Sequence, residues 1–330
     1  MSDNRKLQDH VNFRAIFENA LSGMAICHLI YNDQNKIIDW IIDNVNASFE
    51  KMTGQTAQQV IGVPASERLA GIHQTNPRLL EMLERVSLTG YSERIEEYVS
   101  QLRAWFDVMV YSSEPDKFVF VFDNITDRKQ AQAELTESHM KITRAYDDTV
   151  DIWSKTLDLR DHETEGHSQR VTNLGIQLMR HLNYYVSDMK SVRYGMLLHD
   201  IGKMGVPESI LYKKGALSDH EWREMKRHPE IAYEMLKQNK HLEKSIDIPY
   251  CHHERWDGTG YPRGLKGAEI PMEARIFAVV DTWDALTNDR VYRKAIEPAE
   301  ALDIIERGAG SQFDPIVAQK FMEMMKQELI

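Results

Sequence analysis

The pattern of hydrophobic and polar residues in the first part of the chain predicts a small antiparallel sheet with short helices. Five short runs are rich in β-branched and aromatic residues and are separated by turn-forming residues, as strands are. Two of these runs flank the sequence Asn-Asp-Gln-Asn at 32–35, which predicts a hairpin. The five runs cover residues 24–31, 36–43, 93–99, 104–111 and 118–122.

Helical spacing of apolar residues occurs at two places in the same part of the chain. One amphipathic segment ends at about Leu21 and is followed by Gly23, which predicts a short helix at the start of the chain. The stretch 46–53, ended by Gly54, predicts a second one. Two strands, short helices and a closing three-stranded meander together indicate an α+β module.

A long helix is predicted between about residues 127 and 159, where the chain has neither proline nor glycine. A parallel dimeric coiled coil and a single amphipathic helix packed on its own domain explain this segment equally well, because two of the four heptad positions are threonines. The heptad positions are occupied by Leu135, Ile142, Thr149 and Thr156.

After about residue 148 the pattern is helical throughout, with breaks rich in glycine or proline. We therefore expect an α+β N-terminal domain with an antiparallel sheet, a helical linker and an all-α helical bundle. The expected segments are an N-terminal helix at 1–12, the α+β domain at 13–127, the linker at 128–147 and the bundle at 148–330.

Composition and charge narrow the class of protein. Hydrophobic residues make up 42% of the 330 residues and charged residues 28%, which is ordinary for a globular chain. The formal net charge of -11 argues against binding bulk nucleic acid, since phosphate backbones are bound by surplus Lys and Arg. With two distant cysteines, no apolar leader and no long apolar run, we expect a cytoplasmic protein without membrane insertion.

The candidate chemistry lies in the second half of the chain, where nine of the 13 histidines fall between His162 and His253. Several of them stand next to carboxylates, and neutral imidazoles mixed with carboxylates suit divalent iron, manganese or zinc. A single such histidine is usually a surface or capping residue. Five separate stretches with compatible donors, however, are hard to explain as ordinary surface residues. The stretches are 163–167, 199–203, 228–229, 252–254 and 281–284.

Spacing indicates how two of these stretches would present their donors. Glu163 and His167 are four residues apart, so on a helix both point from one face. His199 and Asp200 are adjacent, and consecutive side chains on a helix diverge by about 100 degrees. The pair can therefore approach the same ion only at a helix end, which Gly202 makes plausible.

Residues from about 148 to 325 resemble the HD-GYP subgroup of the HD phosphohydrolase superfamily. The pair that gives the superfamily its name stands as His199-Asp200, and the second signature begins at His252-His253-Glu254 and ends at Gly260-Tyr261-Pro262. Residues 13–127 resemble a PAS domain, on the stretch 46–54 and the closing Asp123-Asn124-Ile125-Thr126-Asp127. Asn124 stands where that family usually has Asp.

The HD-GYP resemblance implies an all-helical enzyme that holds two or three divalent metal ions, most often iron or manganese, although zinc would also satisfy these donors. An acid at the Glu163 position implies capacity for a third ion. The implied metal ligands are Glu163, His167, His199, Asp200, His228, His252, His253 and Asp281.

The same resemblance implies the remaining site residues. Asp200 and Lys203 would be catalytic, and Lys203 would contact a phosphate oxygen together with Arg290 and Arg293. The loop Gly260-Tyr261-Pro262 would take part in substrate selection and in contacts with a protein partner.

The function that the resemblance implies is hydrolysis of cyclic di-GMP to pGpG, with further hydrolysis to GMP left open. We expect the PAS domain to control this activity in a homodimer formed through that domain and the linker. Related cyclic dinucleotides stay open as substrates. A nucleotide phosphohydrolase and a catalytically silent receptor are the alternatives, disfavoured by the complete signature and donor set. The PAS ligand is unknown, and His28 and His73 are interpreted as ordinary polar groups rather than haem ligands.

Overall fold

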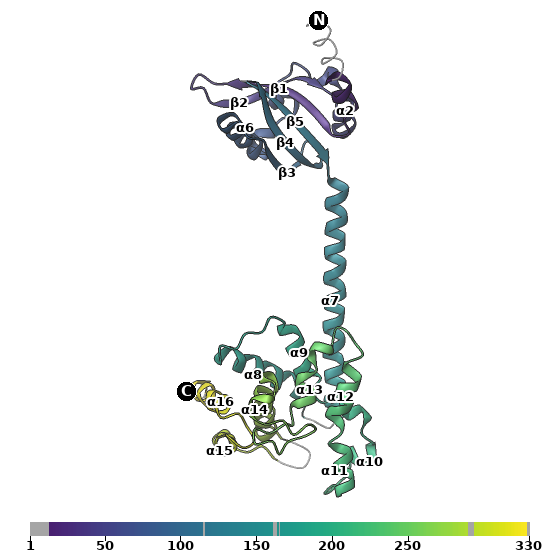
Figure 1. Cartoon of the computed structure of the whole chain (residues 1–330), viewed down its shortest axis with the longest axis vertical. Coiled ribbons are helices and arrows are strands. Elements are labelled where there is room, and N and C mark those ends of the chain that lie inside the picture. The colour runs from purple at the N-terminus through teal and green to yellow at the C-terminus, as the bar shows by residue number, and fades with distance from the viewer. Residues whose placement is uncertain (1–12, 115, 161–163, 165, 290–293, 329–330) are drawn as a thin grey trace, which may run out of the picture. The chain divides into compact units, whose positions relative to one another are not determined.

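The computed structural model describes residues 13–114, 116–160, 164, 166–289 and 294–328 (Figure 1). The chain forms two compact units, Met1–Met140 and Lys141–Ile330. The division falls within one helix, α7 (Thr126–Arg160). Among the described residues, no helix is both long and apolar enough to cross a membrane.

The N-terminal unit contains a five-stranded antiparallel sheet in the order β2-β1-β5-β4-β3. All five expected strands are present, so the predicted α+β module is confirmed. The central pairing joins β1 to β5, with Ala25 opposite Phe120. The strands are β1 (Gly23–Tyr31), β2 (Ile37–Val45), β3 (Glu93–Val99), β4 (Ala104–Glu114) and β5 (Lys117–Asn124).

Short helices connect β2 to β3, and the first of them is fixed by a buried asparagine. The side-chain oxygen of Asn46 accepts hydrogen bonds from the amides of Met24 and Phe49, and its amide group donates to the carbonyls of Phe17 and Ser22. Asn46 thereby caps α2 and ties it to β1. The helices are α2 (Ala47–Thr53), α3 (Ala57–Val60), α4 (Ala65–Arg68), α5 (Ile72–Thr75) and α6 (Pro77–Thr89).

The C-terminal unit is helical, as expected. Its core packs α8, α14 and α16 together, with buried side chains that include Val171, Phe277 and Phe321. Its elements are α8 (His167–His181), α9 (Met189–Leu197), η1 (Ile201–Gly205), α10 (Glu208–Leu211), α11 (Asp219–Met225), α12 (His228–Leu236), η2 (Glu243–Ser245), α13 (Asp247–Cys251), η3 (Gly267–Glu269), α14 (Met272–Thr287), α15 (Pro298–Gly308) and α16 (Pro315–Glu328).

Helix α7 is continuous over 35 residues, which confirms the expected long helix. At its C-terminal end, Val150 and Leu157 are buried against Leu197 of α9 and Leu236 of α12. This end therefore packs on its own domain. Nearer the N-terminal end of the helix, Leu135 and Ile142 are 65% and 66% exposed in the single chain.

Glycine permits one close backbone approach that shapes the site. A Cβ atom on Gly202 of η1 would lie 1.8 Å from the carbonyl oxygen of His228, at the start of α12. A methyl group on the neighbouring Gly205 would instead meet the side chain of Ile231 at 3.0 Å. The atom that a methyl group on Gly202 would strike belongs to the backbone, whereas the atom near Gly205 is the end of a flexible side chain.

We expect Gly202→Ala to lower the free energy of unfolding by about 3 kcal/mol, because η1 must move away from α12 to admit the methyl group. Gly205→Ala is the matched control and should cost less, since Ile231 can shift. Urea denaturation of both variants measures the difference. Equal stability of Gly202→Ala and the unsubstituted chain would contradict this packing.

Candidate metal centre

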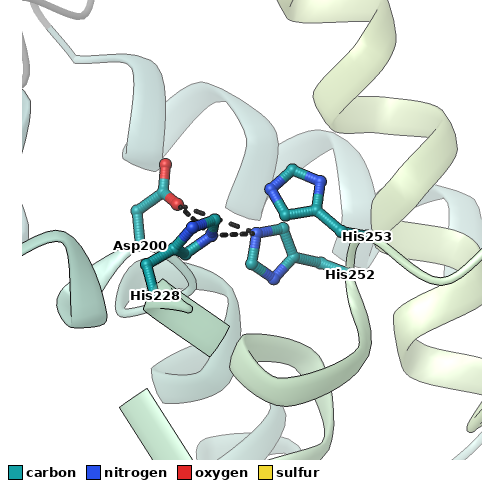
Figure 2. Close-up of side chains that lie close together, drawn as sticks. All are labelled: Asp200, His228, His252 and His253. Atoms are coloured by element: carbon teal, nitrogen blue, oxygen red, sulfur yellow. Dashed lines mark hydrogen bonds and ion pairs between the residues drawn. The ribbon is translucent and has the colours of Figure 1, made fainter. Parts of the chain in front are cut away.

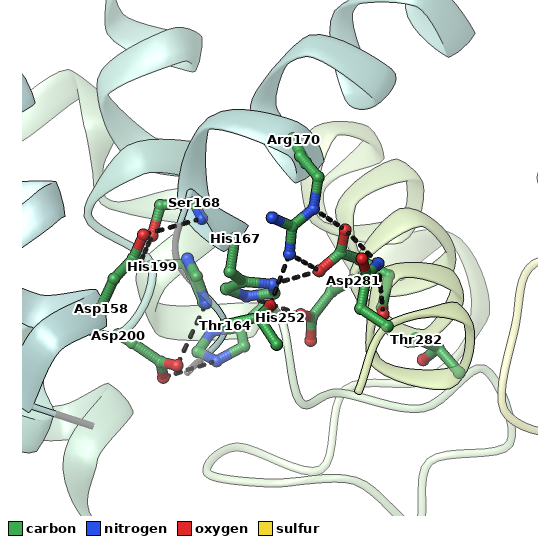
Figure 3. Close-up of polar contacts among 12 residues, drawn as sticks. Asp158, Thr164, His167, Ser168, Arg170, His199, Asp200, His252, Asp281 and Thr282 are labelled. Atoms are coloured by element: carbon green, nitrogen blue, oxygen red, sulfur yellow. Dashed lines mark hydrogen bonds and ion pairs between the residues drawn. The ribbon is translucent and has the colours of Figure 1, made fainter. Parts of the chain in front are cut away.

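Seven histidine and carboxylate side chains, distant in sequence, come together in two groups. Within each group the donor atoms all lie within 4.8 Å of one another. Helix ends supply most of them: His228 and His167 begin α12 and α8, while His252 and His253 directly follow α13. The first group is Asp200, His228, His252 and His253 (Figure 2), and the second is His167, His199 and Asp281 (Figure 3).

The two groups meet at the pair His199-Asp200. Helix α9 ends at Leu197 and η1 begins at Ile201, so both residues lie in the turn between these elements. There His199 Nε2 is 3.1 Å from Asp200 Oδ2, although each residue belongs to a different group. The predicted helix end is thus present, and it places adjacent residues where two ions could share them.

Hydrogen bonds fix which ring nitrogen of each histidine faces the centre. Nδ1 of His199 is 2.9 Å from the Met196 carbonyl, and Nδ1 of His228 is 2.9 Å from that of Met225. His252 Nδ1 lies 3.1 Å from a carbonyl oxygen in α13. Because a carbonyl only accepts, each Nδ1 donates, which leaves Nε2 as the ring nitrogen that faces the neighbouring donors.

A buried carboxylate does the same for His167. Asp284 of α14 accepts a hydrogen bond from His167 Nδ1 at 2.7 Å and two from Arg170, at 2.7 and 2.9 Å. Burial alone would raise the pKa of Asp284, but the hydrogen bonds from His167 and Arg170 lower it below its ordinary value. Asp284 therefore stays ionised and holds the imidazole in place.

No role was expected for Asp284 or Arg170 from the sequence. The signal was present, because Asp284 follows Asp281 by three residues and Arg170 follows His167 by three, which places each pair on one helix face. Spacing alone does not show that the two faces meet, since that depends on how α8 and α14 pack.

Asp200 is the acidic centre of the first group. Its Oδ2 atom is 2.7 Å from Lys203 Nζ, whereas its buried Oδ1 atom has no hydrogen-bond partner among the described residues. Oδ1 nonetheless lies 3.3 Å from His228 Nε2 and 3.7 Å from His252 Nε2. A carboxylate oxygen facing two nitrogen lone pairs is an arrangement that a cation between them would satisfy, so these residues fit a divalent metal ion.

The protonation states of the side chains in the first donor group also suit metal binding. Burial lowers the pKa of His228 to about 3, and it lowers the pKa of His253 well below the ordinary value as well. Both imidazoles are therefore neutral near pH 7. Burial would raise the pKa of Asp200, but Lys203 and His199 lower it well below the usual range, so the carboxylate is ionised.

The Gly-Tyr-Pro loop lies against the first group of donors. The ring of Tyr261 stacks on His253, with centroids 4.8 Å apart, and Lys226 Nζ lies 5.2 Å from the centroid of the same ring. Glu254, the buried carboxylate of the His252-His253-Glu254 signature, accepts hydrogen bonds from the amides of Arg263 and Leu265 and so holds the loop. A Cβ atom on Gly260 would lie 2.3 Å from the amide nitrogen of Arg255, and Pro262 follows Tyr261 in the loop.

Three expected site residues, Glu163, Arg290 and Arg293, lie outside the described residues. Lys203 is described, and its ammonium group forms an ion pair with Asp200.

The PAS-like unit contains a cavity of about 110 Å³ between the sheet and the short helices. Its wall is mostly apolar and includes Cys27, Trp40 and Phe106. Neither His28 nor His73 lines it. The Nδ1 atom of His28 is 2.7 Å from Asp43, and the Nε2 atom of His73 is 3.1 Å from Asp39, so both are partnered polar groups.

Comparison with known proteins bears on both units. Residues 151–317 match the HD domain family, and residues 12–87 match the PAS domain family. A Vibrio cholerae protein named cyclic di-GMP phosphodiesterase is 34% identical over 250 residues, which are 71% of this chain and 50% of that protein.

Two further relatives are similar at the same level. A Thermotoga maritima protein, also named cyclic di-GMP phosphodiesterase, is 35% identical over 54% of this chain and 50% of its own length. A second Vibrio cholerae protein, named 3′3′-cGAMP-specific phosphodiesterase 3, is 33% identical over 68% of this chain and 50% of its own length. The chain thus spans about half the length of these relatives.

We expect Asp284→Asn to weaken metal binding about 10- to 100-fold, because an amide accepts less strongly from His167 and no longer fixes its tautomer. Asp303→Asn, at an exposed position on α15, is the control and should leave metal affinity unchanged. Titration of metal into the metal-free chain measures both. Equal affinities for the two variants would show that Asp284 does not support His167.

Proposed function

This chain belongs to the HD domain family, and we propose that it is a metal-dependent phosphodiesterase that hydrolyses cyclic di-GMP to pGpG. The observation that carries the proposal is the pair of donor groups joined at His199-Asp200, in which an ionised carboxylate and four correctly oriented imidazoles are brought together from separate helix ends. Paired sites of this kind are used to hydrolyse phosphate esters.

Asp200, His228, His252 and His253 would hold one ion, and His167, His199 and Asp281 would hold the other. We propose iron or manganese, and the donors also suit zinc. Glu163 would serve a third ion. When bound, such ions supply a hydroxide nucleophile at neutral pH and withdraw charge from the phosphodiester.

The chain's own groups have separate tasks. Lys203 keeps Asp200 ionised, and we assign to it, together with Arg290 and Arg293, contacts with the phosphate oxygens of the substrate. Gly260, Tyr261 and Pro262 would border the bound nucleotide, with Tyr261 held on His253. The outer side of this loop is where we place the expected protein partner.

The choice of cyclic di-GMP rests on the names of two of the relatives, and the third relative's name points to 3′3′-cGAMP. Both compounds present phosphodiesters to the same donors. Hydrolysis onward to GMP would require the linear product to bind in the same site.

The direct test incubates the purified chain, loaded with ferrous iron or manganese, with cyclic di-GMP, 3′3′-cGAMP and GTP, and separates the products by chromatography. We expect pGpG from cyclic di-GMP and at least about 100-fold slower turnover by Asp200→Asn. His220→Ala, an exposed histidine of α11, is the matched control and should keep full activity. Phosphate release from GTP alone, or no product with any metal, would contradict the proposal.

We propose that the PAS domain controls the enzyme and that the chain is a homodimer joined through this domain and α7. The exposed Leu135 and Ile142 are seven residues apart, as the core positions of a coiled coil are. A sensor can influence a distant site only through a structural element that has two conformational states. A helix paired with its copy in the dimer is such an element.

The double variant Leu135→Asp/Ile142→Asp should sediment as a monomer, because carboxylates at paired core positions repel each other. The control Ala133→Asp/Met140→Asp places the same charges seven residues apart on the opposite side of the heptad and should remain dimeric. Sedimentation velocity distinguishes the two. Identical sedimentation of both variants and the unsubstituted chain would contradict dimerisation through α7.

A further inference from the structure

Arg160, the last residue of α7, stands at the wall of a narrow cavity beside both donor groups. The cavity is also lined by His167 and His199 of the second group and by Asp200 of the first. Lys203 of η1 is part of the same wall. The side chain of Arg160 therefore shares a cavity with residues of both donor groups.

The guanidinium of Arg160 is poorly partnered among the described residues. Its Nη1 atom donates to the sulfur of Met204 at 3.2 Å, and a thioether is a weak acceptor. Its buried Nε atom has no hydrogen-bond partner. The carboxylate of Asp158, two residues earlier on the same helix, accepts a hydrogen bond from the hydroxyl of Ser168 at 2.5 Å.

A buried donor on a cation without an acceptor costs free energy unless a ligand supplies one. The cavity has about 10 Å³ of free volume, which is room for one water-sized group. A phosphate oxygen has that size, whereas a guanine ring does not. A water molecule has that size too, but the donor belongs to a cation, and a charge-assisted hydrogen bond to an anionic oxygen is the stronger one.

We propose that Arg160 is a further substrate-binding residue, whose guanidinium donates a hydrogen bond to a non-bridging oxygen of the substrate phosphate. The inference rests on the proposed phosphodiesterase function and adds a phosphate contact from α7 to those expected from Lys203, Arg290 and Arg293. The planar guanidinium presents its donors in a fixed fork that matches phosphate oxygens.

The test compares Arg160→Met, which keeps the apolar stem and removes every donor, with Arg160→Lys, which restores only a point charge. We expect Arg160→Met to raise the KM for cyclic di-GMP at least about tenfold, with Arg160→Lys in between. Calorimetry should show a parallel weakening of orthophosphate binding to the manganese-loaded chain. Metal content and the midpoint of thermal unfolding should not change.

Arg144→Met is the matched control, since Arg144 is an exposed arginine of the same helix. Unchanged KM and orthophosphate affinity in Arg160→Met would overturn the inference, as would loss of bound metal or of thermal stability, which would indicate a structural role. If the unsubstituted chain hydrolyses no cyclic dinucleotide, the proposed function fails, while the orthophosphate measurement still decides whether Arg160 binds phosphate.

Discussion

The arrangement of the helical unit depends on the burial of one carboxylate among imidazole lone pairs. Asp200 is ionised, and its Oδ1 atom faces His228 and His252 with no hydrogen-bond partner in the described part of the chain. Lone pairs directed at a buried anion are unfavourable unless a cation lies between them. A metal ion would convert this mutual repulsion into coordination.

Helix ends are the means by which the fold achieves this convergence. At a terminus the chain changes direction, so donors that would diverge along a helix can face one point, and the last carbonyls of the turn remain available to orient an imidazole. Met196 and Met225 use their carbonyls in this way for His199 and His228. The close contact between Gly202 and the start of α12 then fixes the distance between two such ends.

The spacing of residues along the sequence predicted most of the strands and helix ends. It did not predict contacts between residues that are far apart in the sequence. Strand alternation located β1 to β5, and the glycine after His199-Asp200 located the end of α9. The helix α6 was missed, although Pro77 and Gly90 mark its two ends. The pairing of β1 with β5, the support of His167 by Asp284 and the position of Arg160 all join residues more than 35 positions apart, and no periodicity encodes such contacts.

The two donor groups should hold metal ions side by side. Anomalous X-ray diffraction from crystals grown with manganese tests it directly. We expect two peaks, one within about 2.5 Å of the Nε2 atoms of His228 and His252 and the other equally close to those of His167 and His199, with Asp200 between them. Crystals of the manganese-saturated chain without a peak at either position would contradict it.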